Sequence, residues 1–199
     1  MSKRLNLSRI NADLQDLASG DIPETILDVI INDDNILGPH YIKLKGPCDT
    51  PYQNGIFKME LNISQTYPFQ PPHLKFHTKM YHPNISQYDG TICIDILKDQ
   101  WSAALKLKSI ILSISSLLEN PNPRDPLEPN IANIYMNNRI QFNENVIKYV
   151  KKFSLRENED NKNVLNEFDD VNDVDVNDVV DVNDVDDVDD VDDVDDGDD

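Results

Sequence analysis

Cysteine is scarce in this sequence, which contains only Cys48 and Cys93. Two cysteines are too few for a disulfide framework, and none of the paired spacings that structural zinc sites use is present. This usage suits a reducing compartment, where a lone thiol can stay free. The scarcity therefore predicts an intracellular protein in which each cysteine is either a single reactive group or an inert buried residue.

Long apolar runs are also missing. No stretch approaches the roughly 20 apolar residues that a helix needs to cross a bilayer. The N-terminal segment holds Lys3, Arg4 and Arg9 and no apolar run, unlike a secretory signal peptide. We therefore expect a soluble protein of the cytoplasm and/or nucleus, in the host cell if the source is a virus, with no membrane partner.

Basic side chains are few, 18 against 37 acidic ones, but the imbalance belongs to one end of the chain. Residues 1–156 hold 17 Lys and Arg and 16 Asp and Glu, whereas residues 157–199 hold one Lys and 21 Asp and Glu. The second segment is a low-complexity repeat of Asp, Val and Asn, with single valines and strong self-repulsion. We predict one folded domain over residues 1–156 and an acidic, disordered tail over residues 157–199.

Hydrophobic periodicity predicts a helix at the start of the folded domain and further helices near its end. Two stripes of apolar residues recur at three- and four-residue steps, the period of one helix face. The first stripe consists of Leu7, Ile10, Leu14 and Leu17, and the second of Leu107, Ile110, Ile111, Ile114, Leu117 and Leu118. Residues 131–136 and 142–153 indicate two more helices.

Four strand-like segments lie between these two stripes. They alternate in polarity or are rich in β-branched residues, and turn residues separate them. They are residues 26–31, 41–45, 56–63 and 74–76. Consecutive strands joined by short turns favour an antiparallel meander with one covered face. The helices before and after the strands make the predicted fold class α+β.

Between residues 66 and 101 the sequence loses its period, and such a long irregular stretch is often functional. The motifs in and after this stretch are Tyr67-Pro68-Phe69-Gln70-Pro71-Pro72, Tyr81-His82-Pro83-Asn84-Ile85, Gly90-Thr91-Ile92-Cys93-Ile94-Asp95-Ile96-Leu97, Trp101-Ser102 and Asn120-Pro121-Asn122-Pro123-Arg124-Asp125-Pro126-Leu127. Their order and spacing resemble the active-site signature of ubiquitin-conjugating (E2) enzymes over about residues 5–155. The joint signal is strong because Asn84 stands nine residues before Cys93 and Trp101 stands eight residues after it.

The resemblance implies the UBC fold, with an N-terminal helix, a four-stranded antiparallel meander and C-terminal helices. It also implies that Cys93 accepts ubiquitin from an E1 enzyme as a thioester and passes it to an amine. The implied partners are ubiquitin, the E1, a RING or HECT E3 ligase and the lysines of substrate proteins, with no nucleic acid. Because the E1 consumes the ATP, no cofactor or metal is expected in this chain.

Three more residues match catalytic positions of the family. Asn84 would hydrogen-bond the oxyanion that forms when the amine attacks, or hold the loop that frames the site. Asp125 would orient the acceptor lysine or help to remove its proton. Asp95 stands where E2 enzymes that discharge directly onto lysine are also acidic. For both carboxylates the alternative is a solvated surface charge without a role.

The resemblance further implies the surroundings of the cysteine. In the family the thiol lies exposed in a shallow groove, without a neighbouring histidine base, and its pKa need not be strongly lowered. We therefore expect His82 to be structural, bonded to the backbone. His73 and His77 stand four residues apart in a strand-like segment, where this step does not bring side chains together as it does on a helix. No third ligand of matching spacing accompanies them, so a zinc site is not expected.

A docking surface for partner enzymes is also implied. Phe69, which follows Pro68, resembles the exposed loop aromatic that E2 enzymes offer to E3 ligases, and Ala103 and Ala104 would complete the surface. The alternative for Phe69 is an ordinary core residue. At Ala103 the sequence departs from the family, which usually has proline there. Arg9 matches a basic position on the face of the first helix that the E1 and E3 enzymes use.

The sequence argues against two other classes of cysteine enzyme. A phosphatase-type loop needs an arginine six residues after the cysteine, where Asp99 stands, and a papain-like protease needs a downstream histidine, whereas all four histidines precede Cys93. Three alternatives remain: an E2-shaped binding module, an acidic chaperone of basic proteins, and conjugation of a different ubiquitin-like modifier. The presence of Cys93 favours an enzyme, and Asp125 and Phe69 favour ubiquitin.

The tail has two interpretations of its own. It resembles the acidic C-terminal extensions with which some E2 enzymes bind basic grooves of cullin-type ligases, where long-range attraction speeds association. The alternative is a solubilising repeat. The acidic insertion near the cysteine that accompanies such tails in the family is missing here.

Overall fold

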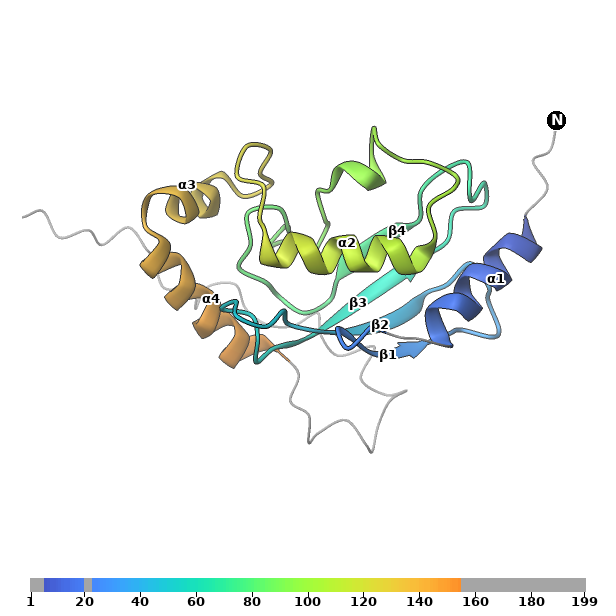
Figure 1. The fold of residues 1–199 in the computed structure, drawn as a ribbon, viewed down its shortest axis with the longest axis horizontal. Helices are drawn as coiled ribbons and strands as arrows, with labels where there is room; N and C mark the ends of the chain where they lie inside the picture. The colour runs from blue at the N-terminus through green and yellow to red at the C-terminus, as the bar shows by residue number, and fades with distance from the viewer. Residues whose placement is uncertain (1–5, 20–22, 155–199) are drawn as a thin grey trace, which may run out of the picture. The chain divides into compact units, whose positions relative to one another are not determined.

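The computed structural model of this protein describes residues 6–19 and 23–154, so the predicted tail lies outside the described residues. One helix, four strands, a short 3-10 turn and three helices follow one another (Figure 1). Their bounds are α1 (Leu7–Ala18), β1 (Ile26–Ile30), β2 (His40–Lys45), β3 (Ile56–Asn62), β4 (His73–Phe76), η1 (Asp95–Leu97), α2 (Leu107–Glu119), α3 (Pro129–Asn137) and α4 (Arg139–Phe153). The predicted helices and strands are confirmed, with ends that differ by up to three residues.

The four strands form one antiparallel sheet in the order β1-β2-β3-β4, which is the predicted meander. Alternate residues of the two central strands are buried, as the period of two requires for a sheet with one covered face. Leu44 of β2 stands opposite Phe57 of β3, and Met59 of β3 stands opposite Phe76 of β4. Register thus brings the large apolar side chains of neighbouring strands onto the same face.

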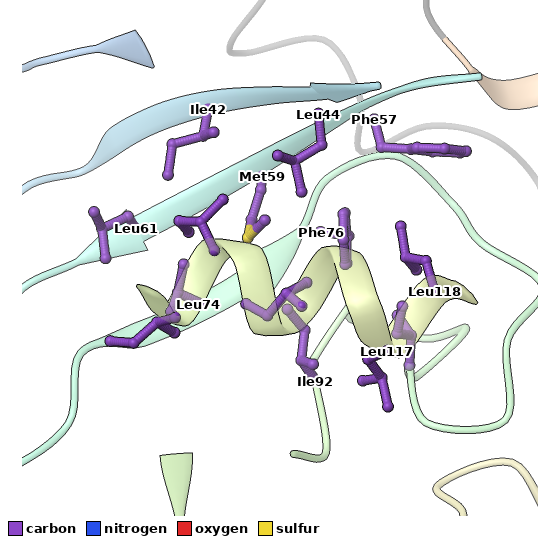
Figure 2. Close-up of a cluster of buried hydrophobic side chains, with 14 of the residues drawn as sticks. Ile42, Leu44, Phe57, Met59, Leu61, Leu74, Phe76, Ile92, Leu117 and Leu118 are labelled. Atoms are coloured by element: carbon purple, nitrogen blue, oxygen red, sulfur yellow. The ribbon is translucent and has the colours of Figure 1, made fainter. Parts of the chain in front are cut away.

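α2 covers that apolar face of the sheet (Figure 2). The predicted stripe is the buried side of the helix, and Ile110 and Ile114 are completely inaccessible to solvent. Each such side chain contributes roughly 1.5–3 kcal/mol when it is fully buried. Because the core lies between α2 and the sheet, the segment that connects β4 to α2 must run over the outside of this core. That segment carries Cys93.

The remaining helices lie at opposite ends of α2. α1 packs beside α2 and β1, whereas α3 and α4 pack against each other (Figure 1). The side chain of Asn6 caps α1 by accepting a hydrogen bond from the backbone N–H of Arg9 at 3.1 Å. No helix within residues 6–19 and 23–154 is long and apolar enough to cross a membrane.

Candidate active site

The loop that carries Cys93 is tied to its surroundings by backbone hydrogen bonds. Ile85 and Ile92 form an isolated antiparallel bridge, and the N–H of Cys93 donates to the carbonyl of Asn84 at 2.8 Å. The side chain of Ile92 enters the core beside α2 (Figure 2). Cys93 therefore follows directly after an anchored residue, and its position is set by the core rather than by a free loop.

Gly90 allows this loop to approach β4. Its carbonyl accepts a hydrogen bond from the backbone N–H of Phe76 at 2.9 Å, and its φ is +74°. A Cβ atom at this position would stand 1.8 Å from the carbonyl oxygen of Phe76. Glycine is thus required twice here, for the left-handed backbone and for the close contact.

Asn84 joins the cysteine loop to the loop that precedes α3. Its side-chain Nδ2 donates to the carbonyls of Asn122 and Asp125, at 2.8 and 3.0 Å, and its Oδ1 accepts from the N–H of Asn122 at 2.8 Å. Only 1% of the residue is exposed. Both amide hydrogens are therefore in use, so the geometry matches the loop-holding role. An oxyanion could receive a hydrogen bond from Asn84 only after one of these bonds had broken.

His82 connects the backbone of Asn84 to α2 through two hydrogen bonds. Its Nδ1 accepts a hydrogen bond from the N–H of Asn84 at 2.9 Å, and its Nε2 then donates to the carbonyl of Leu117 in α2 at 3.0 Å. Burial lowers the pKa of His82 to about 4, because its effect is larger than the opposite effect of the hydrogen bond to the Leu117 carbonyl. The ring is neutral at pH 7 and bonded to backbone on both sides, as the structural interpretation expected.

Two charged side chains meet at the Cys93 sulfur. Nζ of Lys98 donates to Sγ at 2.7 Å, and Sγ donates to Oδ2 of Asp125 at 3.3 Å. The two partners form a weak ion pair of their own, with Nζ and Oδ2 3.7 Å apart. The structure thus brings Asp125 to the cysteine, as the resemblance implied, and adds a lysine that the sequence analysis did not single out.

The expectation that the thiol lies exposed is wrong for this conformation. Cys93 is only 5% exposed and is one of the buried residues of the domain. The two side chains bonded to its sulfur are themselves open to solvent, Lys98 at 48% and Asp125 at 63%. Because exposed side chains reorient quickly, both contacts with the sulfur can break without any change in the fold.

The same contacts set the acidity of the thiol. Burial raises the pKa of Cys93 and is the largest influence, the Lys98 ammonium group opposes it, and the Asp125 carboxylate raises the pKa further. The net direction is upward, so the resting group is the neutral thiol. This agrees with the expectation that the pKa of the cysteine is not strongly lowered.

Asp95 begins η1, two residues after the cysteine. Its backbone carbonyl accepts from the N–H groups of Lys98 and Gln100, at 2.9 and 3.0 Å, and the residue is exposed. The turn that it closes is the feature that folds Lys98 back toward Cys93. The proposed catalytic role of its carboxylate stays a prediction.

The residues expected to dock partners lie together around Trp101. Its indole Nε1 donates to the carbonyl of Pro68 at 2.9 Å, which ties the loop of Phe69 to the loop of Ala103 and Ala104. Phe69 is 70% exposed, so it is not a core residue, and both alanines are exposed. Pro68 itself is buried and contributes its backbone.

Arg9 has a structural task in this conformation. Its guanidinium donates to Oδ2 of Asp13 at 2.7 Å and to the carbonyl of Leu105, just before α2, at 2.8 Å. Asp13 is 4% exposed and also accepts from the hydroxyl of Tyr67. This network fixes α1 to the loops that carry the docking residues. A direct contact of Arg9 with an E1 or E3 enzyme stays a prediction.

Sequence reasoning missed two residues of these networks. Lys98 stands only five residues after the cysteine, but the turn that brings it back is a feature of the fold. Asp13 was readable, because a carboxylate four residues after Arg9 on a helix is a neighbour of that arginine. Within the described part of the chain, no group of three or more His, Cys, Asp and Glu could hold a metal ion.

Comparison with known proteins agrees with this site. The sequence model of the ubiquitin-conjugating enzyme family matches residues 9–150. The E2 domain of a ubiquitin-conjugating enzyme from Toxoplasma gondii is 33% identical, with a TM-score of 0.67 over 74% of this chain and 98% of that one. A chain from Plasmodium yoelii that is assigned to the ubiquitin-conjugating enzymes is 36% identical, with a TM-score of 0.68 over 78% of this chain and 97% of that one. This protein belongs to the ubiquitin-conjugating enzyme family and has the UBC fold.

Proposed function

We propose that this E2 enzyme accepts ubiquitin from an E1 as a thioester on Cys93 and transfers it, with an E3 ligase, to a substrate lysine. The observation that carries the proposal is the position of the thiol. Its sulfur lies 2.7 Å from the Lys98 ammonium group and 3.3 Å from the Asp125 carboxylate, on a loop that Asn84 joins to the loop of Asp125. A thiolate is a good nucleophile, and the thioester that it forms remains reactive toward amines.

The second half of the reaction needs a deprotonated lysine. A free lysine has a pKa near 10.4 and is mostly protonated at pH 7. In the proposal the carboxylate of Asp125 leaves the sulfur once ubiquitin is attached and orients the incoming amine. Asp95, two residues after Cys93, is the second carboxylate proposed to act on the amine. Asn84 keeps the Asp125 loop in place during this step, and the oxyanion role requires it to release one carbonyl.

The partners follow from the family and the exposed surface. Phe69, Ala103 and Ala104 form the proposed docking surface for a RING or HECT ligase, supported by their exposure and by the hydrogen bond between Trp101 and Pro68. The E1 consumes the ATP, so the proposed reaction needs no cofactor or metal on this chain.

A charging assay tests the proposal. The full-length chain is incubated with E1, ATP and ubiquitin and separated on a gel with and without reductant; an adduct that reductant removes is the expected result. Cys93→Ser should give an oxyester that resists reductant, whereas Cys48→Ser, a matched change at the exposed second cysteine, should charge normally. Absence of an adduct on the wild-type chain would refute the proposed function, and a parallel reaction with another ubiquitin-like modifier and its own E1 distinguishes the modifiers.

A further inference from the structure

Among the described residues, one cation and one anion act on the Cys93 sulfur. Lys98 reaches the sulfur from the turn after η1, and Asp125 reaches it from the loop before α3. The only histidine built into this loop, His82, is buried, and both of its ring nitrogens are bonded to backbone. A proton leaving the thiol therefore exposes a negative charge to Lys98 and Asp125 alone.

The contacts of Lys98 and Asp125 with the sulfur depend on whether the sulfur is a thiol or a thiolate. The observed bonds fit the neutral thiol, because S–H donates to Asp125 while the sulfur accepts from Lys98. After deprotonation the bond from Lys98 becomes a charge-assisted one and strengthens. The carboxylate of Asp125 has then lost its donor and faces a like charge, and because its side chain is 63% exposed it can turn into solvent.

Lys98 is suited to remain a cation in this place. The hydrogen bond to Cys93 is the main cause that raises its pKa, and Asp125 acts in the same direction. An ammonium group donates hydrogen bonds but does not attack carbonyl carbons. Its contact with the sulfur therefore supports a role in stabilising negative charge rather than a role as an acceptor of ubiquitin.

We propose that Lys98 is a catalytic residue of the charging step, in which its ammonium group holds the Cys93 thiolate as it attacks the thioester on the E1. This inference rests on the proposed function and extends it to one residue. A neighbouring lysine or arginine is one of the environments in which proteins increase the population of a thiolate.

The step balances without any further reactant. The thiol proton of Cys93 leaves to solvent, and the sulfur's electron pair forms a bond with the carbonyl carbon of the ubiquitin C-terminus. The bond from that carbon to the E1 sulfur breaks, and the E1 thiolate takes its electron pair and a proton from solvent. After transfer the Cys93 sulfur is a neutral thioester. When an amine later displaces it, the bond between carbon and sulfur breaks and Cys93 leaves as a thiolate, so Lys98 faces a developing negative charge in discharge as well.

Alkylation of the thiol tests the electrostatic part without any partner enzyme. The full-length chain carries Cys48→Ser so that only Cys93 reacts, and the rate with iodoacetamide is measured from pH 6 to 10. Lys98→Gln, which removes the charge, should slow alkylation at pH 7 about three- to fivefold and move the pH midpoint upward. Lys98→Arg, which keeps the charge, should slow it less. About 1 M NaCl should shrink the difference between the wild type and Lys98→Gln, since Lys98 is half exposed.

Charging by E1 measures the functional part on the same variants. Lys98→Gln should lower the rate of thioester formation by a similar factor at limiting concentration of the chain. Discharge of preformed thioester to free lysine should slow in the same direction, because Cys93 leaves as a thiolate in that step. Equal alkylation rates for the wild type and Lys98→Gln, or an arginine variant as slow as the glutamine variant, would overturn the inference. Either of these two results would concern Lys98 alone, because the wild type would still be charged. Failure of the proposed function would instead show as a wild type that forms no thioester.

Discussion

Asn84→Ala tests how the active-site loops are held together. The substitution removes three hydrogen bonds between the Asn84 side chain and the backbone of Asn122 and Asp125. A net contribution of about 1 kcal/mol for each bond gives a loss of about 3 kcal/mol in the free energy of unfolding. For a domain of this size the midpoint of thermal unfolding should fall by about 6–12 °C.

The loss of these bonds should also change the chemistry. When the loop of Asp125 is no longer held, its carboxylate spends less time beside the Cys93 sulfur. Charging with ubiquitin should continue, because Lys98 and the cysteine loop are unchanged, whereas discharge of the thioester to free lysine should slow on the order of 100-fold, the size of effect seen when a preorganised active-site donor is removed.

Three measurements on purified Asn84→Ala follow from this reasoning: thermal unfolding, the rate of charging, and single-turnover discharge to lysine. The matched control is Asn122→Ala. Asn122 is exposed, its backbone groups still meet the Asn84 side chain in the variant, and its own side chain accepts from the N–H of Arg124. A midpoint within 2 °C of the wild type would refute the loop-holding role, and a normal rate of lysine discharge would refute the oxyanion role and the positioning of Asp125 together.

Two further predictions concern the docking surface and the buried histidine. Phe69→Ala should leave thermal unfolding unchanged, since the ring is 70% exposed. It should slow discharge stimulated by an E3 on the order of tenfold, as expected for an aromatic anchor. Tyr88→Ala, at an aromatic residue that is 97% exposed, is the control, and equal effects of the two substitutions would contradict the docking role of Phe69. His82 has a pKa of about 4 in the folded chain against an ordinary value of 6.5, so between these values the unfolded chain binds more protons, and stability falls as the pH is lowered through this range. From pH 7 to pH 5 the His82 contribution should fall by about 2 kcal/mol in urea unfolding, and an NMR titration of the ring with a midpoint near 6.5 would disprove the assignment.

The fold could be predicted from the sequence because its signals are local. The stripe that ends at Leu117 and Leu118 has the period of a helix face, and the alternation over residues 56–63 has the period of a strand, so each element follows from neighbouring residues alone. The meander followed because consecutive strands pair through short turns. The starts of α3 and α4 were less accurate, since Pro129, the first residue of α3, and Asn138, the N-cap of α4, are not part of an apolar stripe.

The family signature pointed to Cys93, Asn84 and Asp125, but it did not reveal what these side chains touch. Asn84 could have been an oxyanion donor or a brace for the loop, and only the contacts with residues about 40 positions later favour the brace. Phe69 could have been a core residue, and only its exposure in the folded chain separates the two possibilities.

The sequence by itself determined the α+β class, the order of the elements and the single cysteine in the signature, because these depend on residues close together along the chain. The tertiary structure alone decided the pairing of charges on the sulfur, where Lys98 and Asp125, 27 positions apart, meet from two different loops. It also decided that the thiol is buried rather than open to solvent. Such contacts exist only after the core between α2 and the sheet has formed, because that core sets where each loop begins and ends.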